Sequence, residues 1–193
     1  MLAELEALIT EMGPLSGVSR QLLLYARISR GYVLIGEGRS AEAQAEAEAV
    51  LRESTRIRHV DVVRLELCAL NLLGESLRAQ DLYVEAEAIA RGNLPRDEEQ
   101  TDTGFHLLLI SSLSGQGRHE EALTEFRKCS PPRLPAASGD LDLAAAVALH
   151  GLGRKDEAES AGLRALAACE RYLHPAHPRV GEIHVLLARI ASA

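Results

Sequence analysis

Aromatic side chains, long apolar runs and lysine are all scarce in this sequence. Aromatic residues make up 3% of the 193 residues and Trp is absent, which disfavours a β-sandwich built on aromatic packing. An uninterrupted apolar run of about 18 residues, the length that a membrane-spanning helix needs, does not occur. The stretch from Met1 to Met12 is acidic and amphipathic and lacks the basic and cleavage regions of a secretory leader. We therefore expect a soluble, cytoplasmic protein without a membrane partner.

The basic residues are almost all arginine, and acidic residues outnumber them. Among the 21 Lys and Arg residues, lysine occurs only at Lys128 and Lys155, a bias typical of a high-GC bacterial genome. The formal net charge is −7, so the field of the whole molecule repels nucleic acids and acidic membrane surfaces. We therefore expect no nucleic-acid partner.

Cysteine is also infrequent. Cys68, Cys129 and Cys169 are odd in number, far apart and embedded in helical patterns. This arrangement favours reduced thiols packed in a core over a disulfide or a zinc site.

Small and aliphatic residues dominate instead. Hydrophobic residues make up 47% of the sequence, and they are almost all Ala, Leu, Val and Ile, which favour closely packed helices. Apolar residues recur every three to four positions, as at Leu70, Leu73 and Leu77, and this is the helical period. Composition and pattern together predict an ordered, all-α fold.

A six-residue motif occurs four times and sets a repeat register. Its last residue is always alanine, at spacings of 43, 36 and 36 residues, and we interpret each occurrence as the turn between two antiparallel helices. The occurrences are residues 38–43 (GRSAEA), 81–86 (DLYVEA), 117–122 (GRHEEA) and 153–158 (GRKDEA).

A second position confirms this register. Twelve residues before each alanine lies a residue that is small in three of the four cases, and we predict that the two helices of each pair approach closely there. The four residues are Gly31, Gly74, Ile110 and Ala146.

Each pair therefore reads as a first helix, a turn and a second helix, and we expect a single domain over residues 1–193. Prolines stand where helices should stop, at Pro14, Pro95, the cluster of Pro131, Pro132 and Pro135, and Pro175 with Pro178. The longest loop is expected at residues 130–139. First helices are predicted at 18–37, 58–79, 100–115 and 139–151, second helices at 40–55, 83–94, 119–129 and 155–172, repeats at about 18–55, 58–94, 100–129 and 139–172, and capping helices at 1–13 and 178–193.

The motif, the small residues and the Glu-Ala pairs resemble the tetratricopeptide repeat over roughly residues 18–193. The segment 173–178 (LHPAHP) and the apolar helix after it are similar to the longer repeats of the kinesin light chain type, which are frequent in bacteria. The resemblance implies a right-handed superhelical solenoid of antiparallel helix pairs. It also implies a non-enzymatic scaffold or adaptor that holds a protein or peptide on its concave face.

Candidate chemistry is sparse. His174, His177 and His184 form the one histidine cluster, and because Pro follows the first two we assign them to a turn and not to a metal. Phosphate loops, nucleophile elbows, Cys-x-x-Cys pairs and His-Glu-x-x-His helices are missing, so we predict no cofactor, no metal and no catalytic residues.

The charged residues between Glu42 and Arg64 are interpreted as solvated surface, although the arginines among them could instead meet an acidic partner segment or a phosphate. We expect Arg52, Arg56, Arg58 and Arg64 to pair with Glu48, Glu53 and Asp61, and Glu42 and Glu46 to lie on an ordinary helix face.

In the resembled solenoids the first helix of each pair lines the concave side, so its outward residues are the predicted partner contacts. Chaperone-binding relatives hold a carboxylate with lysine, which this stripe lacks, so we expect a different ligand. Three alternatives stay open: a regulatory module for a small molecule or signalling peptide, an enzyme built on Glu75, Arg78 and His150, and a homodimer through a terminal helix. The predicted contacts are Tyr25, Ser29, Tyr32, Asn71, Glu75, Arg78, Ser111, Ser114 and His150.

Overall fold

The computed structural model describes residues 2–12, 18–56, 62–100, 104–129, 135–175 and 177–192. Within these ranges all regular secondary structure is helical, which confirms the predicted all-α class. The chain divides into two compact units, Met1–Asn93 and Leu94–Ala193. The single domain and the right-handed course along all of the helix pairs stay predictions.

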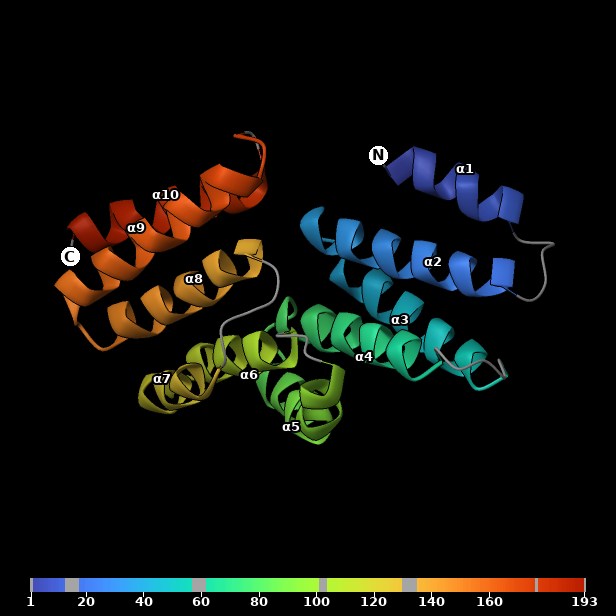
Figure 1. Ribbon diagram of the computed structural model, residues 1–193, viewed down its shortest axis with the longest axis horizontal. Coiled ribbons are helices and arrows are strands. Elements are labelled where there is room, and N and C mark those ends of the chain that lie inside the picture. The colour runs from blue at the N-terminus through green and yellow to red at the C-terminus, as the bar shows by residue number, and fades with distance from the viewer. Residues whose placement is uncertain are drawn as a thin grey trace. The chain divides into compact units, whose positions relative to one another are not determined.

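The described residues of the first unit form four helices and most of a fifth (Figure 1). Helix α2 contacts both α3 and α4, α3 contacts α4, and α1 packs on α2. The core of this unit lies between α2, α3 and α4, where Leu24, Val50 and Leu72 are fully buried. The helices are α1 (Leu2–Met12), α2 (Val18–Gly36), α3 (Ser40–Ser54), α4 (Val62–Arg78) and α5 (Tyr83–Gln100), which crosses into the second unit.

The second unit repeats this contact pattern. Helix α8 contacts α6 and α7, as α4 contacts α2 and α3, and α10 contacts α8 and α9 in the same way. Helices α4, α8 and α10 thus each pack on both helices of the preceding pair, which is sequential helix packing of the tetratricopeptide type. The helices are α6 (Gly104–Gly115), α7 (His119–Lys128), α8 (Pro135–Gly151), α9 (Lys155–Tyr172) and α10 (Pro178–Ser192).

The four turns of the repeat motif share one backbone structure. Gly38, Gly117 and Gly153 have φ of 76°, 76° and 71°, and Asp81 takes the same left-handed region with φ of 62°. In each turn the next N–H donates to a carbonyl five residues earlier, which is the Schellman motif that ends a helix at a left-handed residue. These bonds join Arg39 to Leu34, Leu82 to Leu77, Arg118 to Leu113 and Arg154 to Leu149, with N···O distances of 2.9, 3.0, 2.9 and 3.0 Å.

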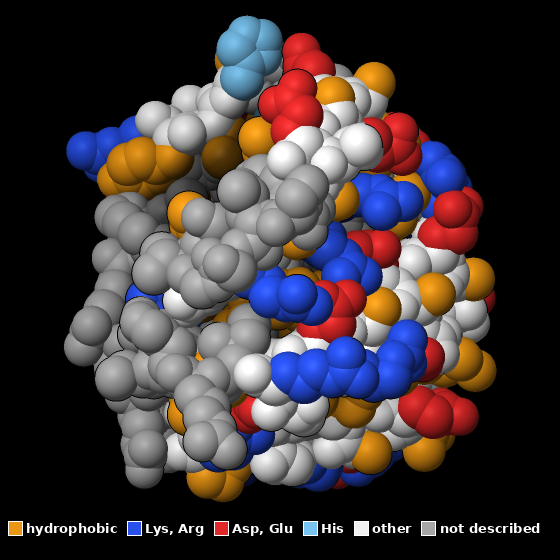
Figure 2. Space-filling model, turned by 90° about the vertical axis from the view of Figure 1, so that its right-hand side faces the viewer, with side chains coloured by type: hydrophobic (Ala, Val, Ile, Leu, Met, Phe, Trp, Pro, Cys, Tyr) orange, Lys and Arg blue, Asp and Glu red, His pale blue; other side chains and the backbone are white. Residues whose placement is uncertain are grey.

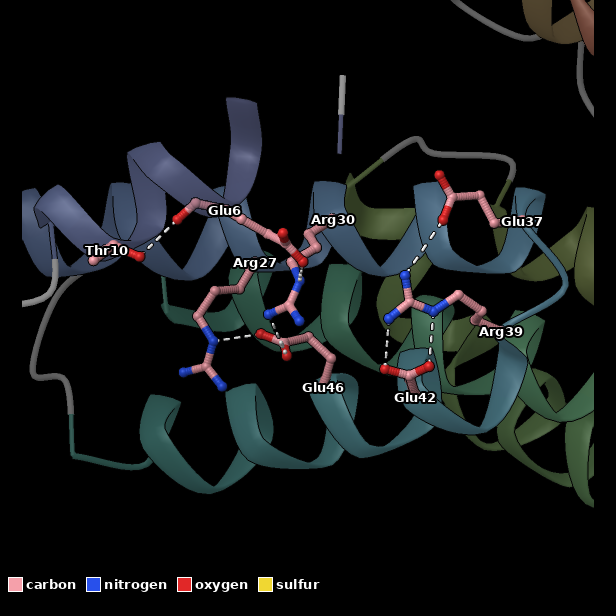
Figure 3. A network of polar contacts seen from close by, with 8 residues as sticks. All are labelled: Glu6, Thr10, Arg27, Arg30, Glu37, Arg39, Glu42 and Glu46. Atoms are coloured by element: carbon pink, nitrogen blue, oxygen red, sulfur yellow. Dashed lines mark hydrogen bonds and ion pairs between the residues drawn. The ribbon is translucent and has the colours of Figure 1, made fainter. Parts of the chain in front are cut away.

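Arginine follows glycine in three of the turns because it bonds a glutamate one turn into the next helix. The Arg39 guanidinium donates to both carboxylate oxygens of Glu42, at 2.7 and 2.8 Å (Figure 3). Arg118 and Glu121 form the same two-bond pair, as do Arg154 and Glu157. The sequence motif Gly-Arg-x-x-Glu is therefore a local folding unit.

The close approach at Gly31 is between successive pairs. A Cβ built on Gly31 would lie 2.9 Å from Cδ1 of Leu72 in α4, which is shorter than the distance at which two non-bonded carbon atoms pack. The prediction that this small residue faces the second helix of its own pair is wrong. Gly31 is small because the next first helix, α4, lies against it.

Two prolines do not end helices as predicted. Pro95 lies inside α5, which runs on to Gln100, and Pro135 begins α8. A proline is tolerated at the first position of a helix, since the N–H that it lacks has no intrahelical partner there. The predicted loop 130–139 therefore overlaps α8, and residues 130–134, like Pro14, Pro131 and Pro132, lie outside the described residues.

An ion-pair network joins α2 to α3, and sequence reasoning missed it. Arg27 donates to Glu46 and Glu53, whose side chains are 12% and 28% exposed, and Arg20 also reaches Glu53, at 3.1 Å. Figure 3 shows Glu46 between Arg27 and Arg30, with Glu6 of α1 approaching Arg30 from the other side. The acidic residues of α3 predicted to be plain surface thus bind the preceding helix.

The predicted arginine patch is only partly described. Arg52 lies 3.8 Å from Glu48, as expected, but Glu53 pairs across the helices and not with this patch. Arg58 and Asp61 lie outside the described residues.

Candidate protein-binding surface

The close approach of α2 and α4 places one polar residue of each helix in contact. The Leu72 side chain packs against Gly31, so the neighbouring residues Tyr32 and Asn71 come into contact. The Tyr32 hydroxyl donates to Oδ1 of Asn71 at 2.7 Å, while the Tyr32 side chain stays 41% exposed. We call the outward face of these two helices, with the six predicted contacts that it carries, the α2–α4 surface.

The other α2 residues of this surface have local partners. Tyr25 is half-buried and packs against the core cluster that contains Leu24 and Leu72. Ser29 is exposed, and its hydroxyl donates to the carbonyl of Tyr25 at 3.1 Å. Tyr25 therefore supports the surface from beneath, and Ser29 and Tyr32 face solvent.

On α4, Arg78 and Glu75 neutralise each other, and the side-chain nitrogen of Asn71 has no acceptor. Arg78 donates to the Glu75 carboxylate one turn earlier, at 2.8 Å, and both side chains are half-buried. The side-chain nitrogen of Asn71 is buried and makes no hydrogen bond within the described residues. The α2–α4 surface therefore presents the Tyr32 ring, covers an amide N–H of Asn71 that has no acceptor, and has no net charge of its own.

The remaining predicted contacts lie in the second unit. Ser111 and His150 are half-buried, on α6 and α8, two helices that contact each other. Ser114 is 9% exposed, and its hydroxyl has no hydrogen-bond partner within the described residues. A continuous contact surface across both units stays a prediction.

The repeat register shows which residues the prediction left out. Tyr32, Glu75 and Ser111 each lie eleven residues before their motif alanine, and Val147 occupies that place in the fourth pair. Val147 is 41% exposed, so it belongs with its equivalents. Ile35, half-buried, is likewise the equivalent of Arg78. The repeat spacing alone predicts both positions, but Val147 and Ile35 are aliphatic, whereas the predicted contacts are all polar or aromatic.

Two stretches of the chain, residues 24–49 and 139–161, match the model of the tetratricopeptide repeat family. These matches support a tetratricopeptide-type repeat protein. The first match covers most of α2 and α3, with their turn and the α2 half of the α2–α4 surface, and the second covers most of α8 with the start of α9. No curated protein matches the chain. The kinesin-light-chain likeness and the bacterial origin stay predictions.

Tetratricopeptide repeats generally mediate protein–protein interaction and scaffolding and are generally non-enzymatic. The described part of this chain has no helix long and apolar enough to cross a membrane. Within the same residues, no group of three or more His, Cys, Asp and Glu side chains is placed to hold a metal.

Core burial was predicted for all three thiols, and the structure confirms it only for Cys169; the pKa of two of the thiols is raised. Cys169 is buried, whereas Cys68 and Cys129 are half-buried. Burial, and then the Glu125 carboxylate, raise the pKa of the Cys129 thiol to about 11, and burial also raises the pKa of Cys169. Raised pKa values leave these two thiols protonated at neutral pH, which is the unreactive form.

Charges on the described surface are interspersed. Figure 2 shows Lys and Arg side chains next to Asp and Glu side chains over one face, without a region of one sign. This pattern agrees with the many ion pairs between neighbouring residues, such as Arg39 with Glu42. A strongly charged partner therefore finds no complementary patch on the described part of this face.

Proposed function

We propose that this protein is a non-enzymatic scaffold that binds an extended peptide segment of a protein partner on the α2–α4 surface. The observation that carries the proposal is the buried side-chain nitrogen of Asn71, which has no acceptor within the described residues and lies beside the exposed Tyr32 ring. The tetratricopeptide matches support the general class of function.

A bound peptide can supply the hydrogen-bond acceptor that the Asn71 side-chain nitrogen lacks. A buried donor without an acceptor costs about 1–3 kcal/mol, and a main-chain carbonyl of a bound strand removes that penalty once the side chains that cover the nitrogen move aside. The Tyr32 ring then gives apolar contact at a small loss of side-chain entropy. The binding residues are thus Asn71 for the peptide main chain and Tyr32, supported from beneath by Tyr25, for its side chains.

The chemistry of the surface predicts how binding responds to salt. Arg78 is already bonded to Glu75, so the surface has no unpaired charge to offer a ligand. Peptide binding should therefore depend weakly on ionic strength, in contrast to the recognition of a charged chain terminus.

The test is selection of peptides from a random displayed library against the purified chain, followed by calorimetry on the selected peptides. Asn71→Ala should weaken binding about fivefold, because one hydrogen bond contributes about 1 kcal/mol. Asn93→Ala is the matched control, since the Asn93 amide on α5 donates to the carbonyl of Ile89 within its own helix. Equal losses in the two variants, or no selected peptide, would contradict the proposal.

A further inference from the structure

The second turn of the repeat motif differs from the other three, because its glutamate lacks an arginine. In the first, third and fourth turns an arginine follows the left-handed glycine and donates to both carboxylate oxygens of the glutamate three residues later. The second turn keeps the left-handed backbone and the glutamate, Glu85, but Leu82 stands where the other turns have arginine. Glu85 is exposed, and its carboxylate makes no hydrogen bond or ion pair within the residues that the structure describes.

Leu82 occupies the same place on the surface as the arginines of the other turns. Its N–H donates to the carbonyl five residues earlier, as the N–H of each arginine does. Leu82 is 39% exposed, which is close to the exposed fractions of the three arginine side chains. These fractions are 40% for Arg39, 36% for Arg118 and 35% for Arg154. The backbone of the second turn therefore presents Glu85 as the other turns present their glutamates, without the side chain that binds it.

The same turn exposes apolar side chains. Val84 is 65% exposed, which is the largest fraction among the exposed large hydrophobic residues that the structure describes. Ala88 lies one helical turn after Val84 on α5 and is also exposed. The equivalents of Val84 in the other turns are Ala41, Glu120 and Asp156. We call Leu82, Val84, Glu85 and Ala88 the second-turn surface, in which apolar groups flank one carboxylate.

The charge of this turn selects the partner. Residues 81–86 contain two acidic residues, Asp81 and Glu85, and neither Lys nor Arg. A carboxylate with both oxygens free is matched best by the planar guanidinium of arginine, which donates two parallel N–H groups. We propose that the second-turn surface binds a segment of a protein partner in which an arginine lies beside apolar side chains. The partner's arginine binds Glu85 as Arg39 binds Glu42, and its apolar neighbours cover Leu82 and Val84.

This surface shares no residue with the α2–α4 surface, and the two should respond differently to salt. An exposed arginine–carboxylate pair changes affinity by up to about fivefold and is screened by added salt. Binding at the second-turn surface should therefore weaken as the ionic strength rises, whereas binding on the α2–α4 surface should change little. Failure of one proposal thus leaves the other standing.

Leu82→Arg tests the proposal by giving the second turn the arginine that the other three have. The new guanidinium should bind Glu85 within the chain, so the surface loses an apolar contact and its free carboxylate together. The variant should unfold in urea at no lower a concentration than the wild type, because the other turns hold the same pair. Leu163→Arg is the matched control, since Leu163 is 52% exposed and lies on α9 in the other unit.

Peptide selection on the full chain measures the binding. A random displayed library is first depleted on Leu82→Arg and then selected on the wild type, and the affinities are determined by calorimetry. The selected peptides should contain arginine next to apolar residues, and Leu82→Arg should weaken their binding about tenfold or more, while Leu163→Arg should leave it unchanged. Glu85→Gln should weaken binding about fivefold and remove most of its salt dependence.

Charge exchange tests the direct contact between the peptide arginine and Glu85. Glu85→Arg should prevent binding of a selected peptide, and a peptide with glutamate in place of its arginine should bind that variant again. Failure to select a peptide that distinguishes the wild type from Leu82→Arg overturns the proposal. So do selected peptides without arginine, peptides that bind Glu85→Gln as tightly as the wild type, or a Leu82→Arg variant that is less stable than the wild type.

Discussion

Replacing Gly31 by alanine tests the contact on which the α2–α4 surface depends. The added Cβ would lie against both methyl groups of Leu72, 2.9 Å from Cδ1, and Leu72 is fully buried in the core of its unit. Forcing a methyl group into such a site costs about 1–3 kcal/mol. Alanine in place of glycine within a helix returns about 1 kcal/mol. We therefore expect Gly31→Ala to destabilise the first unit by up to about 2 kcal/mol.

Gly92→Ala isolates the packing term. Gly92 lies in α5, in the same unit, and an added Cβ there meets nothing within 4 Å, so this variant should gain about 1 kcal/mol. Urea unfolding of both variants, monitored by circular dichroism, should place Gly31→Ala about 1–3 kcal/mol below Gly92→Ala. If both variants are stabilised equally, α4 does not lie against Gly31 and the register of the first two pairs is misassigned.

Four further variants test the turns and ion pairs, each by chemical or thermal unfolding. Gly38→Ala should destabilise by about 1–2 kcal/mol because φ is 76°, and a neutral result would contradict the Schellman turn. Arg27→Ala removes one of the cations beside the largely buried Glu46 carboxylate, so it should lower the free energy of unfolding by about 2–3 kcal/mol. Asp142→Asn breaks an ion pair to Arg164, which is 55% exposed, so it should lower that free energy by less than about 1 kcal/mol. The reverse order of the two effects would refute the network. Burial alone would raise the pKa of Glu53, but hydrogen bonds from Arg27 and Arg20 lower it in the folded chain. The ionised Glu53 carboxylate therefore stabilises the fold fully above its unfolded pKa of about 4.3, and this stabilisation is lost as the pH falls through the lower pKa of the folded state. Glu53→Gln should flatten the pH dependence of unfolding in that acidic range and leave the profile above it parallel to wild type.

The turns could be predicted from sequence because their structure is local. Glycine at a left-handed position, the following arginine and its glutamate lie within five residues, so one short motif specifies all of the contacts. Asp81 adopts the same left-handed turn conformation without being glycine, so the second repeat keeps the spacing of the motif. The first-helix positions followed from counting back from the motif, and this count also contains Val147 and Ile35.

Contacts between helices could not be predicted in this way. Gly31 was assigned to the wrong neighbour because the sequence shows that a small residue is needed but not which helix lies against it. Arg27 pairs with Glu46 and Glu53, residues that by position alone belong on a solvated helix face. Pro95 sits within a helix although proline usually ends one. Each of these depends on tertiary packing that outweighs local preference.

The candidate surface could be predicted from the sequence only in part. The register identified Tyr32 and Asn71 as outward residues of successive first helices, but their hydrogen bond depends on the close approach at Gly31. Ser114 shows the limit of the same reasoning, because it has the right register and is nevertheless 9% exposed.

Hydrogen exchange of the chain with a selected peptide bound tests the proposed function most directly. The account predicts slower exchange within residues 25–35 of α2 and 68–78 of α4, reduced together by Asn71→Ala. Protection confined to α3 or α5, or unaltered by Asn71→Ala, would contradict binding on the α2–α4 surface.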